Sequence, residues 1–171
     1  KEDKTEVGNM LSQEERQTLL KIARDSMEAY VEAGGVTQVT TDDPVLKKVT
    51  GAFVTLHKNG QLRGCIGNIY GVEPLYLTIR DMAIASSTQD PRFPPVEPKE
   101  IKKIEIEISV LSVPKKISNI DEIKLGTHGV IVKKGVNSGV FLPQVATETG
   151  WSKEEFLSTL CSQKAGLSPD A

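Results

Sequence analysis

The sequence of 171 residues is poor in the side chains that form metal centres and disulfide frameworks. It has two cysteines, Cys65 and Cys161, and two histidines, His57 and His128. Neither cysteine belongs to a CxxC pattern, so the sequence has neither zinc-ligand spacing nor a disulfide framework. One disulfide between the two cysteines is disfavoured in a chain of cytosolic character. We therefore predict no structural metal.

Long hydrophobic runs and an excess of charge of one sign are also missing. No apolar run approaches the roughly 18 to 20 residues that span a bilayer, and the charged segment 1–6 has no apolar signal-peptide core. These absences favour a cytoplasmic protein with no membrane partner. The net charge is −2, with acidic and basic residues interspersed, so nucleic-acid binding through neutralised phosphates gains no support.

Cofactor motifs are missing as well. The sequence has no Walker A pattern, no GxGxxG after a strand and no His-Glu-x-x-His, and we predict no bound cofactor. What is present is an ordinary globular composition, with 38% hydrophobic and 26% charged residues. A chain of this length can form one well-buried core, or one domain with a smaller lobe.

The helix and strand signals predict an α+β fold with a mainly antiparallel sheet. Residues 1–11 are expected to be a disordered tail, and residues 12–171 a single domain. Ser12 and Glu15 form a capping-box pattern that begins a long helix. The alternation of apolar and polar residues over 104–110 predicts a half-buried strand.

Two units, each a hairpin followed by a helix, are predicted along the chain. In the first hairpin, Asn59-Gly60 suits the positive φ angles of a type I′ turn, and a helix then begins at Glu73-Pro74. The second hairpin spans residues 129–142, and a capping-box pattern begins its helix at Ser152. The repetition is consistent with an internal duplication.

The register of the first hairpin decides which of its residues share a face. A two-residue loop pairs Leu56 with Arg63 and Val54 with Cys65. Arg63 and Cys65 then lie on one face, which we expect to meet a second layer or a cleft. The opposite face is more apolar and is expected to join the main core; it carries Phe53, Thr55, His57, Leu62 and Ile66.

The stretch 62–67, Leu-Arg-Gly-Cys-Ile-Gly, is the most informative part of the sequence. Arg63 and Cys65 lie two residues apart on a strand, roughly 7 Å from each other on the same face, and a neighbouring cation can lower the pKa of a thiol. Glycine inside a strand indicates that something approaches the backbone closely, which concerns Gly64 and Gly67. Cys65 is therefore either a reactive thiol or a small buried side chain.

Further candidate residues lie beside predicted turns. His128, at the mouth of the second hairpin, could be a general base or a turn residue that bonds the local backbone. Asp90 and Arg92 lie in a loop stiffened by prolines; they could bind a ligand, pair with each other or cap the preceding helix. His57 is expected to be a strand-end residue, and Cys161, on an apolar helical stripe, a core residue.

Several motifs of the chain resemble those of the AMMECR domain family, from about Ser12 to the end. The motifs that carry the resemblance, in chain order, are Leu62-Arg63-Gly64-Cys65-Ile66-Gly67, Asp90-Pro91-Arg92-Phe93, Ile108-Ser109-Val110-Leu111-Ser112, His128-Gly129, Leu142-Pro143-Gln144-Val145 and Lys164-Ala165-Gly166-Leu167. The resemblance implies an α+β domain with a larger and a smaller lobe, association with Memo-like and radical-SAM proteins, and no firmly assigned activity. It also implies a suggested role in transcription, replication, repair or translation.

We therefore carry competing hypotheses of function. The first is an enzyme or enzyme accessory with a cleft that acts on a small anionic or redox substrate. In it Cys65 and His128 are the catalytic residues, and the substrate-binding residues are Arg63, Gly64, Gly67, Asp90, Arg92 and Gln144. The second is a protein-binding adaptor without turnover, in which Arg63 and Cys65 fix the geometry of the strand. Nucleic-acid binding comes last.

Overall fold

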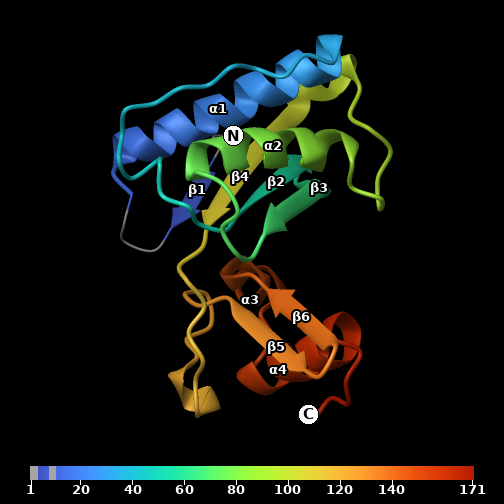
Figure 1. Ribbon diagram of the computed structural model, residues 1–171. Helices are drawn as coiled ribbons and strands as arrows, with labels where there is room; N and C mark the ends of the chain where they lie inside the picture. Colours follow the sequence, from blue (N-terminus) through green and yellow to red (C-terminus); the bar gives the residue numbers. More distant parts are fainter. Residues whose placement is uncertain (1–3, 8–10) are drawn as a thin grey trace. The chain divides into compact units, whose positions relative to one another are not determined.

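The computed structural model describes residues 4–7 and 11–171, and the chain divides into two compact units (Figure 1). Unit 1 is Lys1–Pro114 and unit 2 is Lys115–Ala171. A larger and a smaller unit agree with the two lobes that the resemblance implies. The combination of helices with mainly antiparallel strands confirms the predicted α+β class. No helix within the described ranges is long and apolar enough to cross a membrane.

Unit 1 is built on a four-stranded sheet. Its strands, in spatial order, are β1 (Lys4–Val7), β4 (Ile104–Val110), β2 (Ala52–Lys58) and β3 (Gln61–Asn68). The β1–β4 pair is parallel, whereas β2 pairs in an antiparallel manner with both β4 and β3. β3 therefore lies at the edge of the sheet, and the stretch with Arg63 and Cys65 lies on this edge strand.

The predicted disordered tail over residues 1–11 falls partly outside the described residues, which leave out 1–3 and 8–10. Within the described part, Lys4–Val7 form β1 along β4, and Leu11 is buried in the core. This part of the chain differs from the prediction because its strand is stabilised by pairing with β4. A partner about a hundred residues away leaves no mark on the local sequence.

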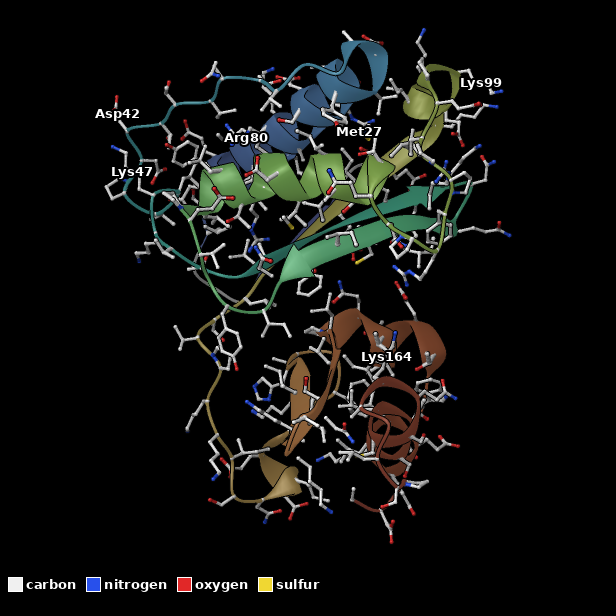
Figure 2. The ribbon with its side chains drawn as sticks, turned by 45° about the vertical axis from the view of Figure 1, so that its right-hand side comes forward. Met27, Asp42, Lys47, Arg80, Lys99 and Lys164 are labelled. Atoms are coloured by element: carbon white, nitrogen blue, oxygen red, sulfur yellow. The ribbon has the colours of Figure 1, made fainter. Side chains whose placement is uncertain are left out.

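Helices α1 (Gln13–Ala33) and α2 (Leu75–Thr88) cover one face of this sheet (Figure 1). The predicted capping box at the start of α1 is confirmed, because Ser12 accepts from the Glu15 N–H and Glu15 accepts from the Ser12 N–H. Between helices and sheet lies one hydrophobic core, in which Met27 is fully buried (Figure 2). Val54 and Leu56 of β2 also contribute to this core.

The face of β2 that joins the core is the one that the sequence analysis assigned to the second layer. The Asn59-Gly60 turn forms as predicted, with φ of 53° and 77°, and His57 pairs with Leu62. Beyond that pair the register shifts by one, so Leu56 faces Gly64. The predicted register and face assignment are therefore wrong.

The shift is a β-bulge at Arg63, which has no partner of its own in the ladder. Thr55 consequently pairs with Cys65, and Val54 with Ile66. Because residues paired across strands share a face, Cys65 and Thr55 lie on the face opposite the helices. Thr55 also pairs with Glu107 of β4, which gives this face a polar row of three residues across three strands.

Unit 2 has its own hairpin, helices and core. Its elements are η2 (Ile120–Glu122), β5 (Val130–Lys134), β6 (Asn137–Phe141), α3 (Pro143–Thr149), α4 (Lys153–Thr159) and the π-helical turn η3 (Leu160–Lys164). The predicted second hairpin and the capping box of Ser152 with Glu155 are confirmed. Phe156 is fully buried and its ring lies 5.1 Å from that of Phe141. A hairpin followed by helices occurs in both units; a duplication as its origin stays a prediction.

Candidate functional site

The bulge in β3 directs the Arg63 side chain into a network of hydrogen bonds within unit 1. Its Nε and Nη2 donate to the two carboxylate oxygens of Glu100, at 3.2 and 3.1 Å. Nη1 donates to the Pro94 carbonyl at 2.8 Å and Nη2 to the Pro95 carbonyl at 3.3 Å. Lys58 adds a second cation, 2.6 Å from Glu100. The Arg63 guanidinium is thus bound to protein groups on all three of its nitrogens.

Glu100 is the centre of this network, although it lies in the short 3₁₀ turn η1 (Pro98–Lys103). It is buried, and its Oε2 also accepts from the Glu97 N–H at 2.8 Å. The hydrogen bond from Arg63 is the largest of the effects that lower the pKa of Glu100 to about 2. A buried carboxylate with this many donors stays ionised and fixes the turn against the end of the hairpin.

Cys65 presents its thiol on the sheet face opposite the helices, where it is half-buried. The sulfur lies 3.1 Å from the Thr55 hydroxyl oxygen. Burial raises the pKa of the Cys65 thiol, and this outweighs the Thr55 hydrogen bond and the positive charge of Arg92, both of which lower it. The pKa of Cys65 is thus shifted toward the neutral thiol, in the direction of the buried-side-chain alternative, and against the shift that a neighbouring cation can cause.

Asp90 and Arg92 hold the backbone of Cys65 from the outer side of β3. One Asp90 carboxylate oxygen accepts the Cys65 N–H at 2.9 Å, and Arg92 Nη2 donates to the Cys65 carbonyl at 3.3 Å. Arg92 also donates to both Asp90 oxygens, at 3.0 and 2.7 Å. These hydrogen bonds lower the pKa of the Asp90 carboxyl to about 2, and the bond from the Arg92 side chain has the largest effect.

The two residues of this ion pair differ in their exposure. The side chain of Asp90 is 2% exposed, whereas that of Arg92 is 50% exposed. The Arg92 guanidinium carbon lies 5.4 Å from the centre of the Phe93 ring, a contact of the cation–π type. Arg92 Nη1 donates to no residue among those the structure describes. The guanidinium is therefore held by Asp90 and Phe93 while part of it faces solvent.

At Gly64 and Gly67, neighbouring atoms of the protein leave no room for a side chain. A Cβ at Gly64 would lie 2.0 Å from the Ser86 carbonyl oxygen, so glycine lets α2 approach β3 closely. The Ser86 hydroxyl, at the same place, accepts from the Ile66 N–H and donates to the Val54 carbonyl. A Cβ at Gly67 would lie 2.4 Å from Cγ of Phe53, the residue opposite it.

The remaining predicted residues belong to unit 2. His128 is exposed; its Nδ1 accepts from the Lys124 N–H at 3.2 Å and its own N–H donates to the Lys124 carbonyl. This is the turn-residue interpretation of His128. Gln144 lies half-buried in the first turn of α3. Cys161 is buried, as predicted.

One hollow on the surface of unit 1 lies away from these residues. It measures about 770 Å³ and is open to solvent; it is lined by Arg24, Glu28, Asn59, Lys102, Lys103, Ile104 and Glu105. None of the predicted site residues lines it. Within the described residues, no group of three or more His, Cys, Asp or Glu side chains is placed to hold a metal ion.

Comparison with known proteins identifies the chain at the level of a family. The family model AMMECR1 matches residues 20–171. The chain belongs to the AMMECR1 family. A protein of Methanothermobacter thermautotrophicus is 46% identical, over 94% of this chain and 86% of its own length. The protein MK0488 of Methanopyrus kandleri is 42% identical, over 96% of this chain and 83% of its own.

A solved structure has the same fold. The crystal structure of the uncharacterised protein PH0010 from Pyrococcus horikoshii matches with a TM-score of 0.83 and 41% identity, over 89% of this chain and 80% of that one. The names of these relatives state no activity. The AMMECR1 family is thus shown for this chain, and the activity has to be argued from its residues.

Of the predicted AMMECR1 site residues in unit 1, the structure brings Cys65, Asp90 and Arg92 into direct contact. Arg63 instead donates to Glu100 and to the carbonyls of Pro94 and Pro95, and Gly64 lies against Ser86 of α2. Sequence reasoning missed Thr55, Ser86 and Glu100. Thr55 could have been found from the hairpin had the bulge been known, whereas nothing local connects Glu100 with Arg63, 37 positions away.

Proposed function

We propose that this AMMECR1-family chain binds a small anion, or an anionic group of a larger substrate, at Arg92 beside Cys65, as an enzyme accessory or enzyme. One observation carries the proposal. Arg92 is the cation of this region whose guanidinium is both oriented by a buried carboxylate and half exposed. A guanidinium held in this way loses little conformational entropy when it binds an anion through its outward N–H groups.

The hydrogen bonds that each guanidinium already makes favour Arg92 over Arg63 as the anion-binding residue. Arg63 donates from all three nitrogens to Glu100, Pro94 and Pro95, so an anion there would have to displace buried bonds. Arg92 keeps Nη1 for a ligand, and the neighbouring Cys65 thiol is itself a weak donor. Asp90, predicted to bind substrate, serves in this proposal to orient Arg92.

A titration with inorganic phosphate, followed by amide NMR shifts at constant ionic strength, tests the anion site. We expect saturable shifts at the amides of Cys65 and Arg92 in the wild type, and their loss in Arg92→Gln. Lys99→Gln is the matched control, since Lys99 is an exposed cation on η1 paired with Glu97 (Figure 2). Saturable shifts that persist in Arg92→Gln, or none in the wild type, would refute the proposal.

Turnover at Cys65 is a further step of the same proposal. It is supported by the incomplete burial of Cys65 and by Arg92, whose charge favours the thiolate. It is opposed by burial, which has the larger effect on the pKa of Cys65. Any activity found with a small anionic or redox substrate should then be abolished by Cys65→Ser and retained by Cys161→Ser.

A second candidate function is a binding module for a partner protein. One observation favours it: Val49, Tyr70 and Val72 are large apolar side chains that are 56%, 63% and 72% exposed. They are neighbours because Gly71 approaches the backbone of Val49 so closely that a Cβ would lie 2.6 Å from it. Exposed apolar clusters on a soluble protein are typical of interaction surfaces.

The partners that the family resemblance implies, Memo-like and radical-SAM proteins, provide the test of this second function. Co-purification with each candidate should be lost in Tyr70→Ser with Val72→Ser. It should be retained in Val136→Ser, a fully exposed valine at the turn of the second hairpin. Retention by the Tyr70 and Val72 variant would exclude this surface, and retention by Cys65→Ser would separate binding from chemistry.

A further inference from the structure

The outer edge of β3 faces a loop of the same chain. β3 is the last strand of its sheet, and such an edge presents unpaired N–H and C=O groups on which a strand of another chain can pair. Here the segment 90–96, which we call the strap, runs past this edge. The strap contacts β3 at Arg63 and at Cys65.

Four hydrogen bonds fasten the strap to the edge strand. At Cys65 the outward N–H donates to Asp90 at 2.9 Å and the carbonyl accepts from Arg92 at 3.3 Å. Two residues earlier, Arg63 donates to the carbonyls of Pro94 and Pro95, at 2.8 and 3.3 Å. At Cys65, side chains thus occupy the positions that the backbone of a neighbouring strand would otherwise take.

The strap does not extend the sheet itself. Three of its seven residues are prolines, Pro91, Pro94 and Pro95, which have no N–H to donate to a further strand. Its end is held on the other side, where the Val96 N–H donates to the Ser87 carbonyl of α2 at 2.7 Å. A segment fastened at both ends and poor in N–H groups terminates the ladder.

We propose that the strap is an edge guard: it keeps β3 from pairing with the β3 strand of a second copy of this chain. β3 is eight residues long, and Cys65 lies at its middle with both backbone groups directed outward. If two copies paired in an antiparallel manner about this point, Cys65 would face its own equivalent. Hydrogen-bonded antiparallel pairs have Cα atoms about 5.5 Å apart, within the range of a disulfide.

This geometry gives a direct experiment on the full chain. The double variant Asp90→Ala with Arg92→Ala, in a Cys161→Ser background, removes both fastenings at Cys65. Diamide, which takes up two electrons and two protons from two thiols, is added, and dimers are counted on a non-reducing gel. We expect a covalent dimer in the double variant, at least several-fold more than in the unmodified strap, and its loss in Cys65→Ser.

The outcomes decide the proposal in each case. A folded double variant that stays monomeric and forms no Cys65 disulfide overturns it, as does a wild type that crosslinks equally well. If circular dichroism shows that the double variant does not fold, the single variants Asp90→Ala and Arg92→Ala, each of which removes one fastening at Cys65, take its place with the same expected result. The control is Lys99→Gln, which leaves the strap's fastenings intact. Because phosphate plays no part in this readout, failure of the anion site and failure of the edge guard are distinguishable.

Discussion

At Cys65, burial and hydrogen bonding act on the thiol in opposite directions. The Thr55 hydroxyl and the charge of Arg92 both favour the thiolate, but removal from water favours the neutral thiol and has the larger effect on its pKa. A half-buried thiol can still donate a weak hydrogen bond or be modified slowly. Replacement of Thr55 or Arg92 should therefore change the pKa of Cys65, and with it the reactivity of the thiol.

The reactivity of the thiol against pH measures this balance. In a Cys161→Ser background, iodoacetamide should modify native Cys65 several-fold more slowly at pH 8 than an unstructured cysteine peptide. Thr55→Val should slow the reaction further, because it removes the hydrogen bond that lowers the pKa of Cys65. Mass spectrometry from pH 6 to 10 gives the rates. A rate that is already maximal below pH 7 would contradict the expectation and favour an activated thiolate.

Gly64 offers a second test on a single residue. Gly64→Ala places a methyl group 2.0 Å from the Ser86 carbonyl oxygen, and either α2 or β3 must move. We expect the free energy of unfolding to fall by about 1–3 kcal/mol, the usual cost of overpacking. Gly35→Ala is the matched control, since its nearest contact is 3.9 Å, and it should change stability little. Equal effects in a urea titration would contradict the steric account.

At the scale of elements, the sequence predicts the hairpin but not its register. Asn59-Gly60 determines the turn, and the first two pairs, Lys58 with Gln61 and His57 with Leu62, follow from it. The bulge at Arg63 then exchanges the two faces, because side chains alternate with a period of two. What stabilises the bulge is Glu100 and the strap, both distant in sequence, so no local pattern could have indicated it.

The same long-range contacts explain why Arg63 and Cys65, which were predicted to form one site, have different partners. Sequence reasoning grouped Arg63 with Cys65 from their spacing, whereas the structure pairs Arg63 with Glu100 and Cys65 with Thr55. Asp90 and Arg92 were predicted beside the thiol from their stiff loop and their motif, and they do contact its backbone. Hydrogen bonds that join residues 25 to 37 positions apart are decided by the tertiary fold.

The two buried carboxylates predict how unit 1 responds to acid. The pKa of Glu100 is lowered from 4.5 to about 2, and that of Asp90 from 3.8 to about 2. A lowered pKa stabilises the fold above the pKa of the unfolded chain, and this stabilisation is lost as the pH falls through the folded value. The free energy of unfolding should therefore decline from about pH 4.5 down to about pH 2.

Glu100→Gln separates this effect from general acid unfolding. The variant should be less stable at pH 7, because Arg63 and Lys58 lose their charged partner, and its stability should decline less steeply between pH 4.5 and 2. Glu154→Gln, an exposed carboxylate in α4, is the control and should keep the wild-type slope. Urea titrations at each pH provide the measurement. A Glu100→Gln slope equal to that of the wild type would contradict the assigned role.

At the scale of the whole molecule, the residues that the structure describes form two hydrophobic cores. That of unit 1 lies between the helices and the sheet, and that of unit 2 surrounds Phe141, Phe156 and Leu160. All the contacts that form the anion site and the strap lie within unit 1. His128 and Gln144 belong to unit 2, so a role for them at Cys65 stays a prediction.

Truncation of one core at a time tests whether each unit is a separate cooperative unit. Phe156→Ala removes a fully buried ring that lies 5.1 Å from Phe141, and should cost about 3–5 kcal/mol. Leu56→Ala makes the matched change in unit 1, where Leu56 is also fully buried, and should cost about 2–5 kcal/mol. Because the cores share no residue, native-state hydrogen exchange should accelerate in unit 2 alone for Phe156→Ala and in unit 1 alone for Leu56→Ala. Exchange that accelerates across both units in either variant would mean that the chain unfolds as one.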